Sequence, residues 1–312
     1  MTTAIAHPNI ALIKYWGKAP GPLNIPASPS LSITLDQLAT TTRVTTQQRD
    51  RFVLNGVETD DRKVAAWLTH LRTHLSIPGL SIETTNNFPT GAGLASSASG
   101  FAALITAINA HCGLGLDATA CSSLARQGSG SAARSLFGGF VELHAPEWCA
   151  TPLFDAAHWP LNVVIAITDT GRKAVSSSVG MERSRTTSPY YPAWIKQTEV
   201  MFDEAREAIR ERDFDLLARL SEQSTLNMHA LMLSSQPPLL YWNGVSVVLM
   251  HRITALRDSG VPVFFTIDAG PQIKAVCLPE AVDVVESALR EVEGVRQLVR
   301  AKLGGGARVV ND

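Results

Sequence analysis

This sequence lacks a long apolar run, a basic leader and paired cysteines, and each absence excludes a class of protein. Nowhere do 18 apolar residues run together, which argues against a membrane span. The first residues, MTTAIAHPNIALIKYW, contain no basic region followed by a long apolar stretch, so we expect no secretion signal. Cys112, Cys121, Cys149 and Cys277 show neither CxxC pairing nor the histidine spacing of a zinc site. They indicate reduced thiols, and we expect a cytoplasmic protein.

An excess of charge of one sign is also absent. The formal net charge is -1 at pH 7, with 27 Lys and Arg against 28 Asp and Glu. This balance provides no basic field to collect a nucleic acid and no polybasic stretch to hold an anionic membrane, so any anion must be captured locally. The expected partner is therefore a small molecule, with no nucleic acid and no membrane.

The hydrophobic pattern changes along the chain from strand-like to helical. The first third alternates short β-type runs with turns, including the hairpin signal Asn55-Gly56, and predicts an antiparallel sheet. Residues 94–111 are small and apolar almost without charge, as in a helix buried on most sides. After a Ser/Thr/Pro-rich stretch at 174–192, long helical patterns dominate. We expect an α+β protein with domains at 1–170 and 171–312, ending in a flexible tail.

The sharpest chemical signal is the segment FPTGAGLASSASG at 88–100, in which small residues lead into the apolar helix. Glycines let backbone N–H groups approach a phosphate, and the first turn of a helix points its amide donors and positive dipole end toward it. Ser96 and Ser97 add hydroxyl donors or a ligand oxygen for Mg²⁺. The segment predicts an anion cradle, and a glycine-rich turn before a packed helix is the structural alternative.

The cradle matches neither of two common nucleotide motifs. Walker A requires a lysine that this loop lacks. A dinucleotide fingerprint requires a third glycine where Ser96 stands, and a βαβ unit where the sequence predicts hairpins. An oxidoreductase that binds NAD through Gly91 and Gly93 stays an alternative, whereas a serine hydrolase is disfavoured because no G-x-S-x-G elbow occurs in these segments.

Two further segments carry cations. GSGSAARSLFGG at 128–139 presents Arg134, whose planar guanidinium matches a carboxylate or phosphate, on an expected flexible loop. A linker with a solvated arginine explains this segment equally well. In IKYWGK at 13–18, strand alternation would put Lys14 and Lys18 on one face and Tyr15 on the other. Two ammonium groups could hold an anion, but this segment alone favours an exposed strand edge protected by lysines.

A carboxylate ends the strand-like run VPVFFTID, just before a sharp turn at Ala269-Gly270-Pro271. A rigid strand can aim a carboxylate into a cleft, which makes Asp268 a candidate catalytic residue. A carboxylate that only caps its own turn is the equal alternative.

Together these segments resemble the GHMP kinase superfamily, and more narrowly the mevalonate diphosphate decarboxylase family. The phosphate loop has the form P-x-x-x-G-L-x-S-S-A from Pro89 to Ala98. Five more segments occur in family order: NIALIKYWGK at 9–18, SLSITL at 30–35, GSGSAARSLFGG at 128–139, VSSSVGM at 175–181 and TIDAGP at 266–271. The resemblance spans nearly the whole chain. It implies the GHMP kinase fold, with an N-terminal ribosomal-S5-like domain, a ferredoxin-like C-terminal domain and a site in the cleft between them.

The same resemblance implies a role for each site residue. Asp268, Arg134 and Lys18 form the catalytic set, with Asp268 as the catalytic aspartate and Arg134 on the substrate carboxylate. The phosphate loop binds ATP and Mg²⁺ through Gly91, Ala92, Gly93, Leu94, Ala95, Ser96 and Ser97, with Ser97 as a metal ligand. The substrate is held by Lys14, Tyr15, Lys18, Ser129, Ser131, Arg134, Ser177 and Met181.

The implied reaction is ATP-dependent decarboxylation of mevalonate 5-diphosphate to isopentenyl diphosphate in isoprenoid biosynthesis, and relatives often form homodimers. Ser178 stands where some bacterial members have arginine and others threonine, so decarboxylation of mevalonate 5-phosphate stays an alternative. A catalytically silent nucleotide-binding relative is a second alternative. A relative that only phosphorylates the C3 hydroxyl is disfavoured, because such enzymes generally lack the aspartate present here as Asp268.

Overall fold

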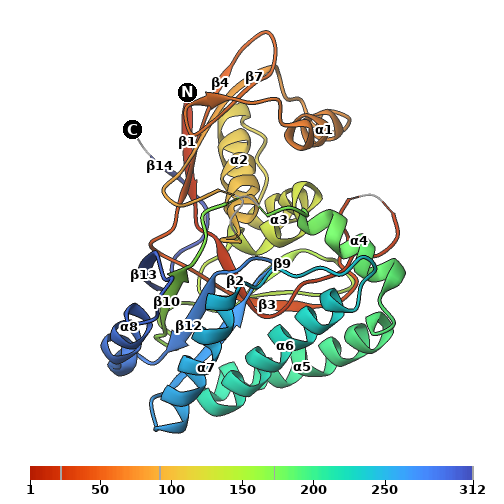
Figure 1. The fold of residues 1–312 in the computed structure, drawn as a ribbon. Coiled ribbons are helices and arrows are strands. Elements are labelled where there is room, and N and C mark those ends of the chain that lie inside the picture. Colours follow the sequence, from red (N-terminus) through yellow and green to blue (C-terminus); the bar gives the residue numbers. More distant parts are fainter. Residues whose placement is uncertain (22, 91–92, 172, 311–312) are drawn as a thin grey trace.

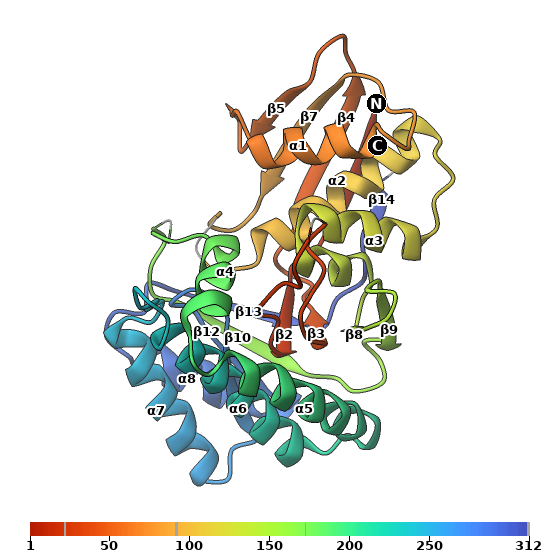
Figure 2. The same cartoon turned by 90° about the vertical axis from the view of Figure 1, so that its right-hand side faces the viewer.

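The computed structural model describes residues 1–21, 23–90, 93–171 and 173–310. Residues 2–6, 40–86 and 308–310 lie at one end of the molecule, and the helices between residues 191 and 290 lie at the other (Figure 1). The N-terminus and the last described strand, residues 308–310, lie at the first of these ends (Figure 2). No helix within the described ranges has the length and apolar character needed to cross a membrane.

A six-stranded sheet at the first end has the order β14-β1-β4-β7-β5-β6. Its strands are β1 (Thr2–Ala6), β4 (Thr40–Thr46), β5 (Arg51–Leu54), β6 (Val57–Glu58), β7 (Leu80–Asn86) and β14 (Arg308–Val310). The β5–β6 hairpin turns at Asn55 and Gly56, with φ of 50° and 80°, so the predicted hairpin is confirmed. The antiparallel prediction is wrong for β5 and β7, which are parallel because the crossover through α1 (Arg62–Leu71) returns the chain in the same direction.

Two helices and a 3-10 helix connect this sheet to the rest of the molecule. The predicted apolar helix is α2 (Ser96–Cys112), which buries Phe101, Ile105 and Ile108 in a core shared with the sheet. α3 (Ala118–Gly128) then leads into the 3-10 helix η1 (Gly130–Leu136), which packs on α2 and α3. The prediction of a flexible loop at 128–139 is therefore wrong for most of its length, because Ala132, Ala133 and Leu136 are buried.

Two four-stranded sheets build the remainder. One has the order β2-β3-β8-β9, with β2 (Asn9–Ile13), β3 (Ser30–Thr34), β8 (Phe140–Leu143) and β9 (Ala150–Phe154). The other has the order β11-β12-β10-β13, with β10 (Asn162–Ile167), β11 (Val263–Ile267), β12 (Ile273–Cys277) and β13 (Gln297–Lys302). The helices are α4 (Ser177–Thr187), α5 (Tyr191–Glu211), α6 (Phe214–Leu233), α7 (Gly244–Asp258) and α8 (Val282–Arg290), with the 3-10 helix η2 (Pro279–Ala281) before α8.

Helix α4 occupies much of the Ser/Thr/Pro-rich stretch at 174–192, where the sequence predicts no helix. Its first turn is stabilised by Ser176, whose side chain accepts a hydrogen bond from the Val179 amide. The sequence of α4 shows no apolar residues at helical spacing, because the helix is mostly polar and few of its residues are buried. Hydrophobic periodicity therefore does not predict it.

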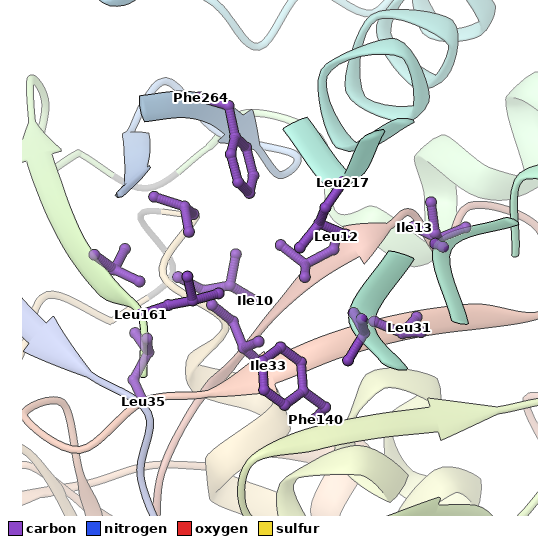
Figure 3. Packing of buried hydrophobic residues seen from close by; sticks show 14 of the residues in the cluster. Ile10, Leu12, Ile13, Leu31, Ile33, Leu35, Phe140, Leu161, Leu217 and Phe264 are labelled. Atoms are coloured by element: carbon purple, nitrogen blue, oxygen red, sulfur yellow. The ribbon is translucent and has the colours of Figure 1, made fainter. Parts of the chain in front are cut away.

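One hydrophobic core joins the β2-β3-β8-β9 sheet to the helical end (Figure 3). Ile33 and Phe140 of this sheet share the core with Leu217 of α6 and Phe264 of β11, and all four side chains are fully buried. Because this core is continuous, the sheet and the helices hold each other in place, and with them the residues at the ends of β2 and β11.

Strand pairing departs from a division of the chain at residue 170 in two places. Strand β10 precedes residue 170 but pairs with β12 and β13. Strand β14 follows it but pairs with β1, and before β14 the Gly304 amide donates to the Thr34 carbonyl at 2.7 Å. The predicted flexible tail is therefore wrong, because its backbone hydrogen bonds are made to the first half of the chain.

Candidate active site

A cavity of about 510 Å³ lies where the ends of five segments meet. They are the chain after β2, the start of α2, the start of η1, the chain entering α4 and the chain after β11. The cavity gathers most of the site residues that the sequence predicts: Lys14, Tyr15, Lys18, Gly93, Ala95, Ser96, Ser97, Ser129, Ser131, Arg134, Ser177, Met181 and Asp268. Leu94 is not among its lining residues, because its side chain is buried in the core. Gly91 and Ala92 lie outside the described residues.

Asp268 follows β11, and its carboxylate lies between two buried lysines. Lys14 Nζ is 2.8 Å from Oδ1 and Lys274 Nζ is 2.9 Å from Oδ2. Burial alone would raise the pKa of Asp268, but the two ammonium groups outweigh burial and hold it well below its ordinary value. The Gly270 amide of the following turn donates to the main-chain carbonyl of Asp268 at 2.8 Å. The carboxylate is thus ionised and lines the cavity.

Lys14 is only 1% exposed, which makes the interpretation of an exposed, lysine-protected strand edge wrong. Strand β2 ends at Ile13, so the alternation of faces does not continue, and Lys14, Tyr15 and Lys18 all line the same cavity. Burial lowers the pKa of Lys14 to about 8, although the charge of Asp268 opposes this shift. The positive charge of the Lys14 ammonium therefore depends on the neighbouring carboxylate of Asp268.

Arg134 is 1% exposed and held by neutral acceptors, so the solvated-linker alternative is wrong. Its guanidinium donates to Ser30 Oγ at 2.5 Å, to Ser32 Oγ at 3.0 Å and to Asn9 Oδ1 at 3.1 Å. No carboxylate in the described ranges lies within ion-pair distance of it. Burial lowers the pKa of Arg134 to about 10, which still leaves it charged at neutral pH. The positive charge is thus positioned but not neutralised, as binding of an anionic ligand requires.

The start of α2 is a suitable place for a phosphate group. Ala95 at the N-cap has φ of 55°, and its own methyl side chain makes no capping hydrogen bond. Gly93 has φ of 84°, and a Cβ built on it would lie 2.8 Å from Gly270 Cα, so only glycine lets the loop backbone approach the turn after β11. Ser97 Oγ and Ser129 Oγ lie 3.3 Å apart at the cavity.

Two more lysines bring positive charge to the cavity. Lys173 Nζ lies 2.7 Å from Ser177 Oγ and 3.3 Å from the Ala269 carbonyl, and burial lowers its pKa to about 8. Lys18 Nζ donates to Ser178 Oγ at 3.0 Å. Among the described lining residues, the cations are Lys14, Lys18, Lys63, Lys173 and Arg134, and the only acid is Asp268. This excess of cations fits polyanionic ligands such as a nucleotide and a phosphorylated acid.

The lining also fits a magnesium ion that arrives with a nucleotide. Mg²⁺ keeps several waters and is usually held by substrate phosphates with one or two protein oxygens. The described part of the chain contains no group of three or more His, Cys, Asp and Glu residues that would form a complete metal cage. The carboxylate of Asp268 and several serine hydroxyls, that of Ser97 among them, are oxygen groups at the cavity that suit the ion.

Sequence reasoning missed Lys63, Lys173 and Lys274. Lys173 lies beside the Ser/Thr/Pro-rich stretch, where a lone lysine gives no signal. Lys274 had a signal, because it interrupts the apolar run of β12, and a lysine in a buried strand requires an anionic partner.

Comparison with known proteins agrees with this arrangement. Residues 6–150 match the family model of the diphosphomevalonate decarboxylase-like N-terminal domain, and residues 163–303 match that of the mevalonate 5-diphosphate decarboxylase C-terminal domain. The chain belongs to the diphosphomevalonate decarboxylase family. The family resemblance seen in the sequence motifs is thereby confirmed.

Individual members of the diphosphomevalonate decarboxylase family match over most of their length. A diphosphomevalonate decarboxylase of Ganoderma lucidum is 38% identical over 86% of this chain and 76% of its own. The structure of "MDDEF in complex with MVAPP, AMPPCP and Magnesium" is 37% identical, with a TM-score of 0.92 over 100% of this chain and 99% of the other. A structure on "mevalonate diphosphate mediated ATP binding" of the Enterococcus faecalis mevalonate diphosphate decarboxylase is 37% identical, with a TM-score of 0.91 and the same coverage. These matches confirm the predicted α+β fold of two domains.

Both domains of the diphosphomevalonate decarboxylase family contribute to the cavity. The segment that matches the N-terminal domain supplies Lys14, the start of α2 and Arg134, and the segment that matches the C-terminal domain supplies Lys173 and Asp268. The ion pair between Lys14 and Asp268 therefore crosses from one domain to the other.

Proposed function

We propose that this protein catalyses the ATP-dependent decarboxylation of mevalonate 5-diphosphate to isopentenyl diphosphate, ADP, phosphate and CO2. The observation that carries the proposal is that Asp268, the start of α2 and Arg134 line one cavity although they are far apart in the sequence. The similar structure that holds MVAPP, AMPPCP and magnesium supports the choice of ligands.

In this proposal the substrate is bound through its two anionic ends. Arg134 takes the carboxylate, because its guanidinium is buried and has only neutral protein partners. The rest of the substrate is surrounded by Lys18, Tyr15, Ser129, Ser131, Ser177 and Met181. Its 5-diphosphate lies at Lys18 and Ser178. Lys14 and Lys173 then face the transferred phosphate beside Asp268.

The nucleotide phosphates lie at the start of α2, where amide groups and the helix dipole favour negative charge. Gly93 to Ser97 form the described part of the loop and the first helical turn around them. Magnesium, when bound, offsets charge on the phosphates, and Ser97 is the hydroxyl that we assign to it.

Asp268 accepts a hydrogen bond from the C3 hydroxyl and orients its oxygen toward the γ-phosphate. Because two ammonium groups lower its pKa, the carboxylate takes the proton only as the new oxygen–phosphorus bond forms. Phosphate then leaves C3, the bond between C1 and C2 breaks to release CO2, and its electron pair forms the double bond between C2 and C3. Lys14 and Lys173 stabilise the departing phosphate electrostatically.

The deciding experiment supplies Mg-ATP with mevalonate carrying zero, one or two 5-phosphates, and measures ADP and CO2 separately. We expect equal amounts of ADP and CO2 from the diphosphate. ADP without CO2 would make the protein a kinase, turnover of the monophosphate alone would change the substrate, and no turnover of any would refute the proposal. A homodimer and a cytoplasmic location are further proposals, which gel filtration and cell fractionation would test.

A further inference from the structure

Lys274 occupies an unusual position for a charged residue. It lies in β12 among Ile273, Ala275, Val276 and Cys277, all of them buried, and is itself 1% exposed. Burying an ammonium group costs free energy unless hydrogen-bond partners and an opposite charge replace the lost water. The partners of the Lys274 ammonium group therefore indicate the function of this side chain.

Its two partners come from different domains. Nζ lies 2.9 Å from Asp268 Oδ2, in the C-terminal domain, and 3.0 Å from the Gly93 carbonyl oxygen, in the N-terminal domain. Lys14, on the other carboxylate oxygen, lines the cavity, whereas Lys274 is not among the lining residues. Lys274 thus contacts both the carboxylate and the phosphate loop from behind, out of reach of a ligand.

The contact with Gly93 also determines how the loop presents its amides. In a trans peptide the carbonyl and the following N–H point in opposite directions. With the Gly93 carbonyl turned to Lys274, the Leu94 N–H points away from the lysine. If this peptide turned over, the Gly93 carbonyl oxygen would leave Lys274 and face the opposite way, toward the cavity that Gly93 lines, where it would repel a phosphate.

We propose that Lys274 is a positioning residue that couples the phosphate loop to the catalytic carboxylate. It holds the carbonyl of the peptide between Gly93 and Leu94 turned inward, away from the nucleotide phosphates, and it fixes one oxygen of Asp268. This role rests on the proposed function, but its effect on the loop requires only that the cavity binds a nucleotide.

The test compares Lys274→Met, which removes the ammonium and keeps much of the side-chain length, with Lys196→Met at an exposed position of α5. Calorimetry measures the affinity for AMPPCP, with and without mevalonate diphosphate. We expect Lys274→Met to bind AMPPCP about tenfold more weakly, the effect of one charge-assisted hydrogen bond. Binding of mevalonate diphosphate alone should weaken less than binding of AMPPCP, because Asp268 is the one proposed substrate contact that Lys274 touches. Lys196→Met should match the unaltered protein in both.

A second pair of variants keeps the test valid if Lys274→Met is unstable. Asp268→Asn and Asp268→Asn/Lys274→Met differ by the same lysine, and the double variant lacks both charges of one ion pair. The double variant should therefore bind AMPPCP about tenfold more weakly than Asp268→Asn, since the lysine acts on AMPPCP binding through Gly93. Equal AMPPCP affinity within either pair would overturn the proposal, as would an equal loss for AMPPCP and mevalonate diphosphate. These measurements require no turnover, so they stay separate from the test of the reaction itself.

Discussion

In the proposed reaction the chemistry depends on Asp268, whose carboxylate is kept ionised by Lys14 and Lys274. We expect Asp268→Asn to lower kcat by about 10²–10⁴, because an amide orients the hydroxyl without taking its proton. The variant leaves two buried ammonium groups without their carboxylate, so the melting temperature should fall too. Steady-state release of CO2 measures the first effect and thermal unfolding the second. A kcat within about tenfold of the unaltered protein would contradict this role.

The lowered pKa values of Lys14 and Lys173 predict an alkaline loss of activity. Burial lowers both to about 8, so each ammonium is present below that pH and is lost as the pH rises through it. We expect kcat/KM to fall steeply above about pH 8, since two phosphate-facing charges disappear together. In Lys173→Arg the fall should become less steep, because guanidinium keeps its proton. The pH profile of both proteins measures this, and equal steepness would show that Lys173 does not take part.

At the scale of elements, the start of α2 shows how closely the loop before it must approach the turn after β11. We expect Gly93→Ala to weaken AMPPCP binding by at least about tenfold, because the new Cβ meets Gly270 Cα at 2.8 Å and the left-handed φ is unfavourable for alanine. Gly100→Ala, within α2 itself, is the matched control. A Cβ there meets nothing within 4 Å, so stability should rise by about 0.5–1 kcal/mol and binding should not change. Equal AMPPCP affinity of the two variants would show that the contact with Gly270 is dispensable.

Local pattern predicted most elements but not those whose partners lie elsewhere in the sequence. α6 matches the helix expected from its periodicity, and the Asn55-Gly56 hairpin follows from residues that accept positive φ. β14 was missed because its strand character comes from pairing with β1. The sequence predicted a flexible loop in place of the ordered 3-10 helix η1, because its small residues give no periodic signal. Their order comes from burial against α2 and α3.

For the whole molecule, the core shared by β3, β8, α6 and β11 predicts that the β2-β3-β8-β9 sheet and the helical end unfold together (Figure 3). We expect Leu217→Ala to lower the free energy of unfolding by about 2–5 kcal/mol, because a fully buried side chain leaves a cavity. Leu226→Ala, at a position of α6 that is 43% exposed, should change it by less than about 0.5 kcal/mol. Denaturant unfolding followed by circular dichroism and by tryptophan fluorescence should give one transition. A separate transition of the helical signal in circular dichroism would contradict a common core.

The sequence by itself determined the chemical groups and their family. Six segments of glycines, serines, lysines, one arginine and one aspartate carried the resemblance to that family, and the resemblance implied a phosphate loop, a carboxylate-binding arginine and a catalytic acid. The residues alone indicated only candidates, because they show local properties: where glycine permits a turn, which side chain is a cation, and which carboxylate follows a strand.

Only the tertiary structure decided how those groups act on one another. Lys14 and Asp268 are 254 residues apart, and Lys274 and Gly93 are 181 apart, so no local pattern reveals either contact. Burial decided the rest: it turned Lys14 from an expected surface residue into a counter-ion and made Arg134 a positioned, uncompensated charge. The physical reason is that the pKa of a group and its hydrogen-bond partners depend on what the fold packs around it, which the neighbours in the sequence do not specify.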